Sequence, residues 1–430
     1  MAKTVSFITL GCKVNQYDSQ AMLEAFEARG YQAVAPREGA DVYVVNTCTV
    51  TGTGDQKSRQ LVRRYQRKNP MAELVIAGCL AQRMGEELRE TGARLILGTQ
   101  YRGQVVELLE KALAEDTQIV AVDGLESAVY EPLLIHQHEG HTRAVMKIQE
   151  GCDNHCTYCI IPSVRGNVRS RSLEDIQKEA AALARAGFRE IVLTGIHLTS
   201  YGRDLPKKPG LMEAIKAVCK QEGIARVRLG SLEPRVVKED FVAAAISNPK
   251  LCQQFHLALQ SGSDDVLRRM KRGYHTQQFR EAVRLLKAAY PSVALTTDVI
   301  VGFPGETEEE FTQTLHFCQE IGFAKIHVFP YSRREGTPAA VMPGQLSKEI
   351  KDARVRQLMA LEAELGVAYR KQFLGMEREV LVEKKHISGA MEGYTAEYIH
   401  TLVQGGNPGE FIKVRLTGLN EEGMTGMPVE

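Results

Sequence analysis

The sequence predicts a multidomain α/β protein made of an open parallel α/β sheet domain, a partial (β/α)6 barrel and a small C-terminal antiparallel β-barrel. From Thr4 to about Leu113, short apolar runs alternate with helical stretches, as in parallel strands joined by right-handed crossovers. A second series of six such units begins near residue 143, which suits a parallel barrel or part of one. After residue 374, alternating apolar and polar residues are separated by Gly-rich turns, which is typical of a small antiparallel barrel.

The expected strands follow in order along the chain. The first domain has them in TVSFITL, DVYVVNT, ELVIAG and ARLILG. The second series has them in RAVMKIQEG, EIVLTG, RVRLGS, QFHLALQ, VALTTDVIVGF and KIHVFPYS, and the tail has them in REVLVEKK, GYTAEYIHTLVQ and EFIKVRLTGL. These patterns divide the chain into an α/β domain, a linker broken by Pro132 and HQHEGH, a barrel, a connecting helix and a terminal barrel, at 1–115, 116–142, 143–344, 345–374 and 375–430.

Composition narrows the class of protein. A chain of 430 residues suggests two to four domains, and 43% hydrophobic with 25% charged residues is ordinary for globular proteins. The net charge of +1 gives no global field for nucleic acid, so any such contact needs local patches. We find no apolar run long enough to span a membrane and no secretory signal, and we expect a cytoplasmic protein. Nine cysteines in a reducing compartment favour metal or redox chemistry over disulfides.

Three cysteines form a C-x3-C-x2-C motif directly after the first strand of the second series. Cys152, Cys156 and Cys159 therefore lie at the C-terminal mouth, where such barrels carry active sites. Three thiolates in one loop can hold an iron-sulfur cluster and leave one iron open to another ligand. The alternatives are a zinc site completed by His155, whose tetrahedral closure would be strained, or three unrelated cysteines.

Three further cysteines share one structural position. Cys12, Cys48 and Cys79 each end a predicted strand of the first sheet, and ligands gather at the carboxyl edge of an open parallel sheet. Adjacent strands lie about 4.8 Å apart, so the three loops can converge on a second cluster, although each thiol alone could belong to the core. The remaining cysteines, which we take as structural, are Cys219, Cys252 and Cys318.

The cysteine motif, with Tyr158 before its last cysteine, resembles that of the radical S-adenosylmethionine (SAM) enzymes. The whole chain resembles the methylthiotransferases, in TLGCKVNQYDSQ, NTCTVT, AGCLAQ, QEGCDNHCTYCIIPSVRG, RSR, GSLEP, LALQSGSD and TDVIVGFPGETEEEF. The resemblance implies two [4Fe-4S] clusters and SAM. The barrel cluster would cleave SAM to a 5′-deoxyadenosyl radical, the second would supply or carry sulfur, and a second SAM would give the methyl group. The tail is similar to a TRAM domain, an RNA-binding barrel of the oligonucleotide-binding type.

Polar residues at the barrel strand ends are the expected SAM contacts. With Tyr158 they are Thr194, Gly195, Ser231, Glu233, Gln260, Ser263 and Asp298, and their roles come from the resemblance. Capping of the following helix is an alternative for Ser231 and Ser263. Thr307 and Glu310 are placed as a capping box.

RNA contact is expected at local basic groups, because the tail from residue 366 has seven Lys and Arg against nine Asp and Glu. There Tyr394 or Tyr398 would stack on bases, assisted by Lys384, Lys385 and Arg415. Arg59, Arg63 and Arg67 form an i, i+4 stripe on a predicted helix, which either contacts phosphate or is a solvated face. Two further groups are Arg165, Arg169 and Arg171 after the cluster loop, and Arg268, Arg269, Lys271 and Arg272 after the fourth strand.

The motif GCKVNQYDS resembles the subgroup that acts on N6-threonylcarbamoyladenosine at position 37 of the tRNA anticodon loop. The expected reaction is 2-methylthiolation of that nucleoside, with an electron donor such as flavodoxin or ferredoxin. A loop nucleotide is single-stranded and can be splayed out for chemistry. The alternatives are an isopentenyladenosine or ribosomal-protein aspartate substrate, or a non-catalytic RNA-binding iron-sulfur protein.

Overall fold

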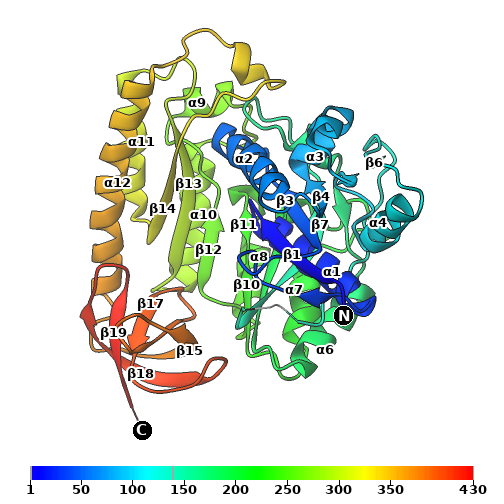
Figure 1. The fold of residues 1–430 in the computed structure, drawn as a ribbon. Helices are drawn as coiled ribbons and strands as arrows, with labels where there is room; N and C mark the ends of the chain where they lie inside the picture. Colours follow the sequence, from blue (N-terminus) through cyan, green and yellow to red (C-terminus); the bar gives the residue numbers. More distant parts are fainter. Residues whose placement is uncertain (1, 138–139, 430) are drawn as a thin grey trace.

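The computed structural model describes residues 2–137 and 140–429, and it confirms the predicted fold class (Figure 1). The first domain is a six-stranded, all-parallel sheet in the order β2-β1-β3-β4-β5-β6. Its strands are Gln32–Ala33, Thr4–Thr9, Val42–Thr47, Glu73–Gly78, Leu95–Leu97 and Ile119–Ala121 in that order. The last strand, β6, lies within the stretch that we assigned to a linker at 116–142, of which residues 138 and 139 fall outside the described residues.

Helices cover both faces of this sheet. One face packs on α1 (Lys13–Ala28) and α4 (Val105–Ala114) through an apolar cluster that includes Phe26 and Leu109. The other packs on α2 (Gly52–Lys68) and α3 (Cys79–Met84) through Val62, Tyr65 and Ala81. The apolar residues of the predicted strands contribute to both cores, because the strands of a parallel sheet are buried on both faces.

The barrel has the six parallel strands predicted. They are β7 (Arg143–Glu150), β9 (Glu190–Gly195), β10 (Arg226–Leu229) continued by β11 (Ser231–Leu232), β12 (Gln254–Leu257), β13 (Ala294–Val301) and β14 (Lys325–Pro330). The third strand is interrupted at Gly230, so the strands form two sheets, β10-β9-β7-β8 and β11-β12-β13-β14. The short β8 (Arg169–Ser170) is antiparallel to β7, and the arc stays open.

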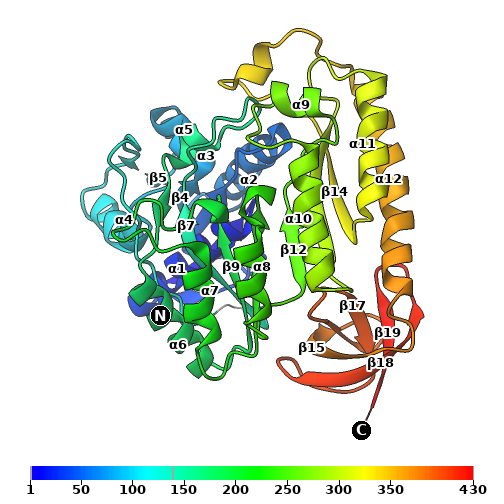
Figure 2. The same cartoon turned by 180° about the vertical axis from the view of Figure 1, so that it is seen from behind.

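Helices line the outside of the arc (Figure 2). They are α6 (Leu173–Arg185), α7 (Leu211–Cys219), α8 (Glu239–Ile246), α10 (Thr276–Ala289) and α11 (Glu308–Ile321). The short α5 (Ile161–Arg165) instead packs against α3 of the first domain, and α9 (Asp264–Arg269) lies at the upper end of the arc in Figure 2. Thr307 and Glu310 form the predicted capping box of α11. The long helix α12 (Lys348–Lys371) is more than a connector, because it packs along β14 and buries Leu358 in the main core.

The C-terminal domain is a closed five-stranded barrel in the order β15-β16-β17-β19-β18. Its strands are β15 (Glu377–Lys385), β16 (Met391–Tyr394), β17 (His400–Val403), β18 (Phe411–Leu419) and β19 (Met424–Pro428). All pairs are antiparallel except β17 with β19, which is parallel. Arg226 and Arg228 of β10 donate to the carbonyl oxygens of Tyr394 and Ala396, both at 3.0 Å, and so fix this domain beneath the arc.

The first domain closes the open side of the arc. Helix α1 packs against β7 and β9, where Tyr17 and Ala21 join the main core. At the other edge, beyond β14, Ser332 Oγ accepts a hydrogen bond of 2.9 Å from the Gly52 amide, and Arg334 forms an ion pair of 3.0 Å with Asp55. The two cysteine-bearing edges therefore face one interior. Among the described residues, no helix is long and apolar enough to cross a membrane.

Candidate active site

The C-x3-C-x2-C loop lies at the carboxyl end of β7, as predicted. Cys156 is buried, and Cys152 and Cys159 are half-buried. The loop is anchored across the mouth, because the Thr157 amide donates to Met270 O at 3.1 Å and Thr157 O accepts from the Ala339 amide at 2.8 Å. Burial raises the pKa of Cys152 to about 11 and that of Cys159 to about 12, so these thiols keep their protons at neutral pH until a metal displaces them.

Cys12, Cys48 and Cys79 also lie together. They follow β1, β3 and β4, which are direct neighbours in the sheet. Burial raises the pKa of Cys48 to about 11, and the nearby Cys79 and Cys12 add to the rise. A side chain on Gly11, whose φ is +103°, would place its Cβ 3.1 Å from Cys48 Sγ, so glycine there keeps the space beside the sulfur open.

The spacing of the sulfur atoms argues against a zinc ion at either group. Zn–S bonds of about 2.3 Å in a tetrahedron place sulfur atoms roughly 3.8 Å apart. Within the described residues, only His256, Asp298 and His327 bring three ligand atoms within 4.8 Å of one another. His155, the possible fourth zinc ligand, is exposed. Wider thiol triplets fit a four-iron cluster, which is larger than one ion. Cys219, Cys252 and Cys318 are buried away from both groups, as a structural role requires.

Glu233, an expected SAM contact, is the electrostatic centre of the barrel mouth. Its carboxylate lies 2.7 Å from Arg235 Nη2 and 3.1 Å from Arg272 Nη2, and it accepts from Asn154 Nδ2 at 2.9 Å. Burial opposes its ionisation, but the hydrogen bond from His197 and the charges of Arg272 and Arg235 lower the pKa of Glu233 to about 2. A fixed negative charge therefore stands beside the cysteine loop.

Arg272 contacts both Glu233 and a cluster cysteine, a role that the sequence did not indicate. We placed it with a basic surface group, but its side chain is only 8% exposed and Nη1 donates to Cys156 Sγ at 3.3 Å. It also donates through Nε to Tyr274 at 3.1 Å. Its position after a strand end was visible in the sequence, whereas the fold of the turn that directs it inward was not.

The other expected SAM contacts line the same mouth and the barrel interior. Thr194 is buried at the end of β9, and Gly195 beside it and Tyr158 in the loop are half-buried. Ser263 starts α9 without capping it, and its buried Oγ has no partner among the described residues, so it is free for a ligand. Ser231 is exposed, and Gln260 has a φ of +67° and pairs through its backbone with Asp298 and Ile300.

Asp298 faces two histidines that the sequence analysis missed. Asp298 Oδ2 lies 3.2 Å from His256 Nε2, and the His256 and His327 rings stack at 5.9 Å. The pairing of β13 with β14 sets Asp298 directly opposite His327. The alternation of apolar and polar residues in QFHLALQ and KIHVFPYS was the available signal, because it sets both histidines on the face opposite the core residues Phe255 and Ile326. His256 is half-buried and His327 is exposed.

Comparison with known proteins identifies the three parts. Residues 146–318 match the radical SAM superfamily, residues 371–423 the TRAM domain and residues 4–98 the uncharacterized protein family UPF0004. Threonylcarbamoyladenosine tRNA methylthiotransferase MtaB of Bacillus subtilis is 41% identical over 96% of this chain and 93% of its own. The chain belongs to the radical SAM methylthiotransferase family.

Other relatives agree with that assignment. MtaB of Thermotoga maritima is 38% identical over 98% of this chain and 96% of its own, and tRNA-2-methylthio-N(6)-dimethylallyladenosine synthase of Pelotomaculum thermopropionicum is 34% identical over 99% and 97%. The radical SAM methyltransferase TsrM of Kitasatospora setae shares the fold, with a TM-score of 0.58, 14% identity and coverage of 79% of this chain and 77% of that one. This methylthiotransferase is a transferase whose family uses SAM and a [4Fe-4S] cluster. The barrel cysteines and the unpartnered Ser263 hydroxyl fit them.

The prediction that Arg165, Arg169 and Arg171 contact RNA is wrong. Arg165, Arg169 and Arg171 are at most 5% exposed. Arg165 pairs with Glu150 and Asp18, and Arg171 pairs with Glu179. The arginines after the cluster loop therefore form buried ion pairs inside the protein. Of the second group, Arg269 holds Glu310 at 2.8 Å, while Arg268 and Lys271 are exposed.

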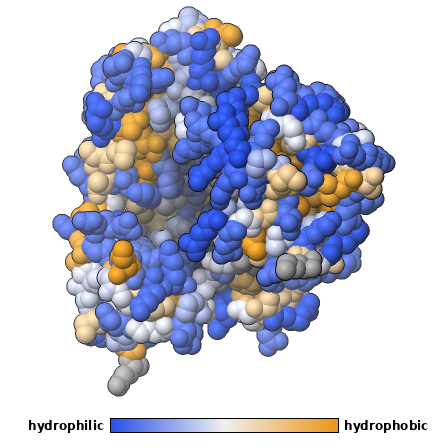
Figure 3. Space-filling view, in the orientation of Figure 1, coloured by the Kyte–Doolittle hydropathy of each residue, from blue (hydrophilic) through white to orange (hydrophobic). Residues whose placement is uncertain are grey.

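The remaining basic residues stay accessible. Arg63 and Arg67 are exposed on α2 without ion-pair partners among the described residues, while Arg59 pairs with Asp55 at 2.8 Å. Figure 3 shows strongly hydrophilic surface over α2, beside a hollow in the face of the molecule. In the TRAM domain, Lys384 pairs with Glu392 at 3.3 Å, Lys385 is exposed and Arg415 pairs with Glu377 at 3.0 Å.

The tyrosines of the TRAM domain face the barrel. The rings of Tyr394 and Tyr398 stack on each other at 4.7 Å, with Arg143 over both and Arg228 over Tyr398. Part of the ring surface that we expected to stack on RNA bases is therefore already covered by protein.

Proposed function

We propose that this enzyme transfers a methylthio group to C2 of N6-threonylcarbamoyladenosine 37 in the tRNA anticodon loop. Two relatives that cover nearly the whole chain, at 41% and 38% identity, are named for that nucleoside. The observation in the structure that favours it is Lys13. Because its substrate would be tRNA, we place the enzyme in the cytoplasm, supplied with electrons by a flavodoxin- or ferredoxin-type donor.

Two [4Fe-4S] clusters are part of this proposal. Cys152, Cys156 and Cys159 would hold the first, which would supply the electron for the cleavage of SAM. Cys12, Cys48 and Cys79 would hold the second cluster, which would supply or carry the sulfur. The polar residues at the barrel strand ends would orient SAM.

Lys13 supports the choice of nucleoside. It follows Cys12 directly at the start of α1, and its side chain reaches water. Partial desolvation lowers its pKa, with Tyr398 acting against this and Arg143 and Arg228 adding to it. Among the described residues it has no hydrogen-bond or ion-pair partner. The threonylcarbamoyl group carries a carboxylate and an isopentenyl group does not, so a free ammonium beside a cluster ligand suits the former.

Lys13→Met should lower kcat/KM for tRNA bearing threonylcarbamoyladenosine by roughly 10- to 100-fold, which matches the 1.5–3 kcal/mol of a hydrogen bond between charged groups. Nucleoside mass spectrometry measures the product. Lys13→Arg, which keeps the charge, should retain most activity, and iron content and 5′-deoxyadenosine formation should be unchanged in both. A loss of iron that parallels the loss of product would instead assign Lys13 to support of the cluster in the first domain.

We expect α2 to contact tRNA phosphates. Replacing Arg63 and Arg67 together by alanine should weaken tRNA binding and reduce the slope of log K against log salt by about 1 to 2, because each lost phosphate contact removes roughly 0.7 to 0.9. Filter binding across a salt series measures this. The matched control is Arg280→Ala with Arg284→Ala on α10, whose side chains pair with Glu320 and Glu281. An unchanged slope in the α2 variant would make the stripe a solvated face.

The test of the proposed function is anaerobic reconstitution with SAM, a reductant and tRNA carrying threonylcarbamoyladenosine. A methylthio gain on that nucleoside supports the proposal. Formation of 5′-deoxyadenosine with a gain only on isopentenyladenosine tRNA, or on a ribosomal protein, would keep the enzyme class and replace the substrate. Loaded protein that binds tRNA and consumes no SAM would support an RNA-binding role.

A further inference from the structure

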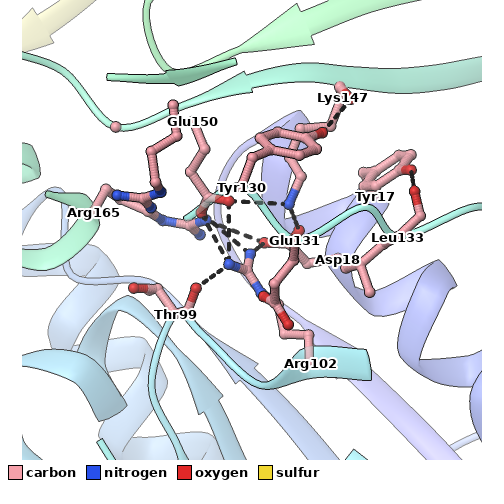
Figure 4. A network of polar contacts seen from close by, with 12 residues as sticks. Tyr17, Asp18, Thr99, Arg102, Tyr130, Glu131, Leu133, Lys147, Glu150 and Arg165 are labelled. Carbon is pink, nitrogen blue, oxygen red and sulfur yellow. Dashed lines mark hydrogen bonds and ion pairs between the residues drawn. The ribbon is translucent and has the colours of Figure 1, made fainter. Parts of the chain in front are cut away.

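Five charged side chains form a buried network between the first domain and the barrel (Figure 4). Asp18 comes from α1, Arg102 from the first domain, Lys147 and Glu150 from β7, and Arg165 from the end of α5. Each side chain is at most 4% exposed. Arg102 Nη1 lies 2.5 Å from Asp18, Arg102 Nη2 lies 3.1 Å from Glu150, and Lys147 pairs with both carboxylates.

Arg165 is the member of the network that also contacts a sulfur atom. Its Nη1 donates to Asp18 at 3.1 Å and to Glu150 at 2.5 Å, and its Nη2 donates to Asn15. Its Nε donates to Cys79 Sγ at 3.2 Å. The two carboxylates hold Nη1 and the Asn15 amide oxygen holds Nη2, so the direction in which Nε of the planar guanidinium points is fixed.

Arg165 is also close in sequence to the barrel cysteine loop. Helix α5 begins at Ile161, two residues after Cys159, and ends at Arg165. One rigid side chain therefore runs from the loop that carries the barrel cysteines to a sulfur of the first domain. Ion pairs that are buried this completely repay their desolvation poorly, so stability alone is a weak reason for such a network.

A hydrogen bond to a cluster thiolate acts on the redox state of the cluster. Reduction adds one negative charge, and a cationic donor on a ligating sulfur stabilises the reduced form more than the oxidised form. Arg102 provides the comparison, because it has the same charge and the same two carboxylate partners. It donates to Thr99 O and Glu131 instead of a sulfur.

We propose that Arg165 is a positioning residue for the cluster of the first domain, whose reduction potential it raises through Cys79. The inference rests on the proposed second cluster. It adds to that proposal a residue that sets the electronic state of the cluster.

The experiment uses the full chain with Cys152, Cys156 and Cys159 replaced by alanine, so that only the cluster of the first domain can form. After anaerobic reconstitution, iron is counted and the midpoint potential is measured by redox titration with EPR detection. Arg165→Gln should decrease the ratio of reduced to oxidised cluster about tenfold at fixed potential, which corresponds to a midpoint lower by about 59 mV for one electron. Arg165→Lys should give a smaller shift in the same direction, and Arg102→Gln should shift the potential by less than half as much.

The outcomes separate the two proposals. If the triple cysteine variant binds no iron while the unmodified chain binds about four irons, enough for one cluster, the second cluster and this inference with it would be refuted. Iron bound normally with equal shifts for Arg165→Gln and Arg102→Gln, or with no shift, would overturn the role of Arg165 alone. If Arg165→Gln does not fold, Arg165→Lys decides, because a midpoint equal to that of the parent chain overturns the proposal.

Discussion

Replacing Cys48 with alanine is expected to abolish methylthio transfer while the enzyme continues to cleave SAM to 5′-deoxyadenosine. Cys48 is buried at the end of β3, where its amide donates to Ser58 Oγ at 3.0 Å and its carbonyl accepts from the same hydroxyl at 2.8 Å. It belongs to the first domain and makes no contact with the barrel cysteines that the structure records. The loss of product should exceed about 100-fold, because losing a hydrogen-bond partner of a metal ligand alone costs roughly 10- to 100-fold.

Two control variants accompany Cys48→Ala. Cys156→Ala should remove both 5′-deoxyadenosine and product, because Cys156 lies in the barrel triplet. Cys219→Ala, in a buried thiol on α7, should keep both activities. Mass spectrometry of nucleosides and chromatography of 5′-deoxyadenosine measure the two steps separately. Product formation by Cys48→Ala near the wild-type rate would remove the sulfur-delivering role from this group.

The convergence of Cys12, Cys48 and Cys79 was predictable because it depends on topology alone. Parallel strands joined by right-handed crossovers end at the same edge, so residues that follow the strands must meet there. The pairing of β1 with β3 and of β3 with β4 makes the three loops direct neighbours. The barrel triplet was predictable for the same reason, since one loop at one strand end carries all three residues.

The burial and the ion-pair partners of Arg165 and Arg171 were not predictable from the same local patterns. Arginine after a cluster loop has the same appearance in sequence whether it reaches RNA or a carboxylate on another domain. Arg165 meets Asp18 across 147 residues of chain, and Arg171 lies beside Tyr17 across 154. Such pairs depend on how the first domain docks on β7, which local periodicity does not encode.

The largest expected loss of stability comes from breaking the buried pair of Arg171 and Glu179. Both side chains are fully buried, the Tyr17 hydroxyl lies 2.9 Å from Glu179, and Arg171 Nη2 donates to Leu133 O at 3.0 Å. Arg171→Met leaves a carboxylate without its cation, and removing one partner of a buried pair typically costs about 3–5 kcal/mol. Urea unfolding followed by circular dichroism at pH 8 measures this, with Arg185→Met on the exposed face of α6 as the matched control.

The dependence of that loss on pH distinguishes a lost charge partner from lost packing. Burial raises the pKa of Glu179 to about 7, above its ordinary value near 4.5, so the folded protein holds the proton more tightly than the unfolded chain. Its contribution to the free energy of unfolding therefore falls as pH rises from about 4.5 to 7. Without Arg171 the folded pKa should rise further, so Arg171→Met should be less destabilised at pH 5 than at pH 8. Arg171→Met with Glu179→Gln should lose that difference, and an equal loss at both pH values in the single variant would assign the effect to packing.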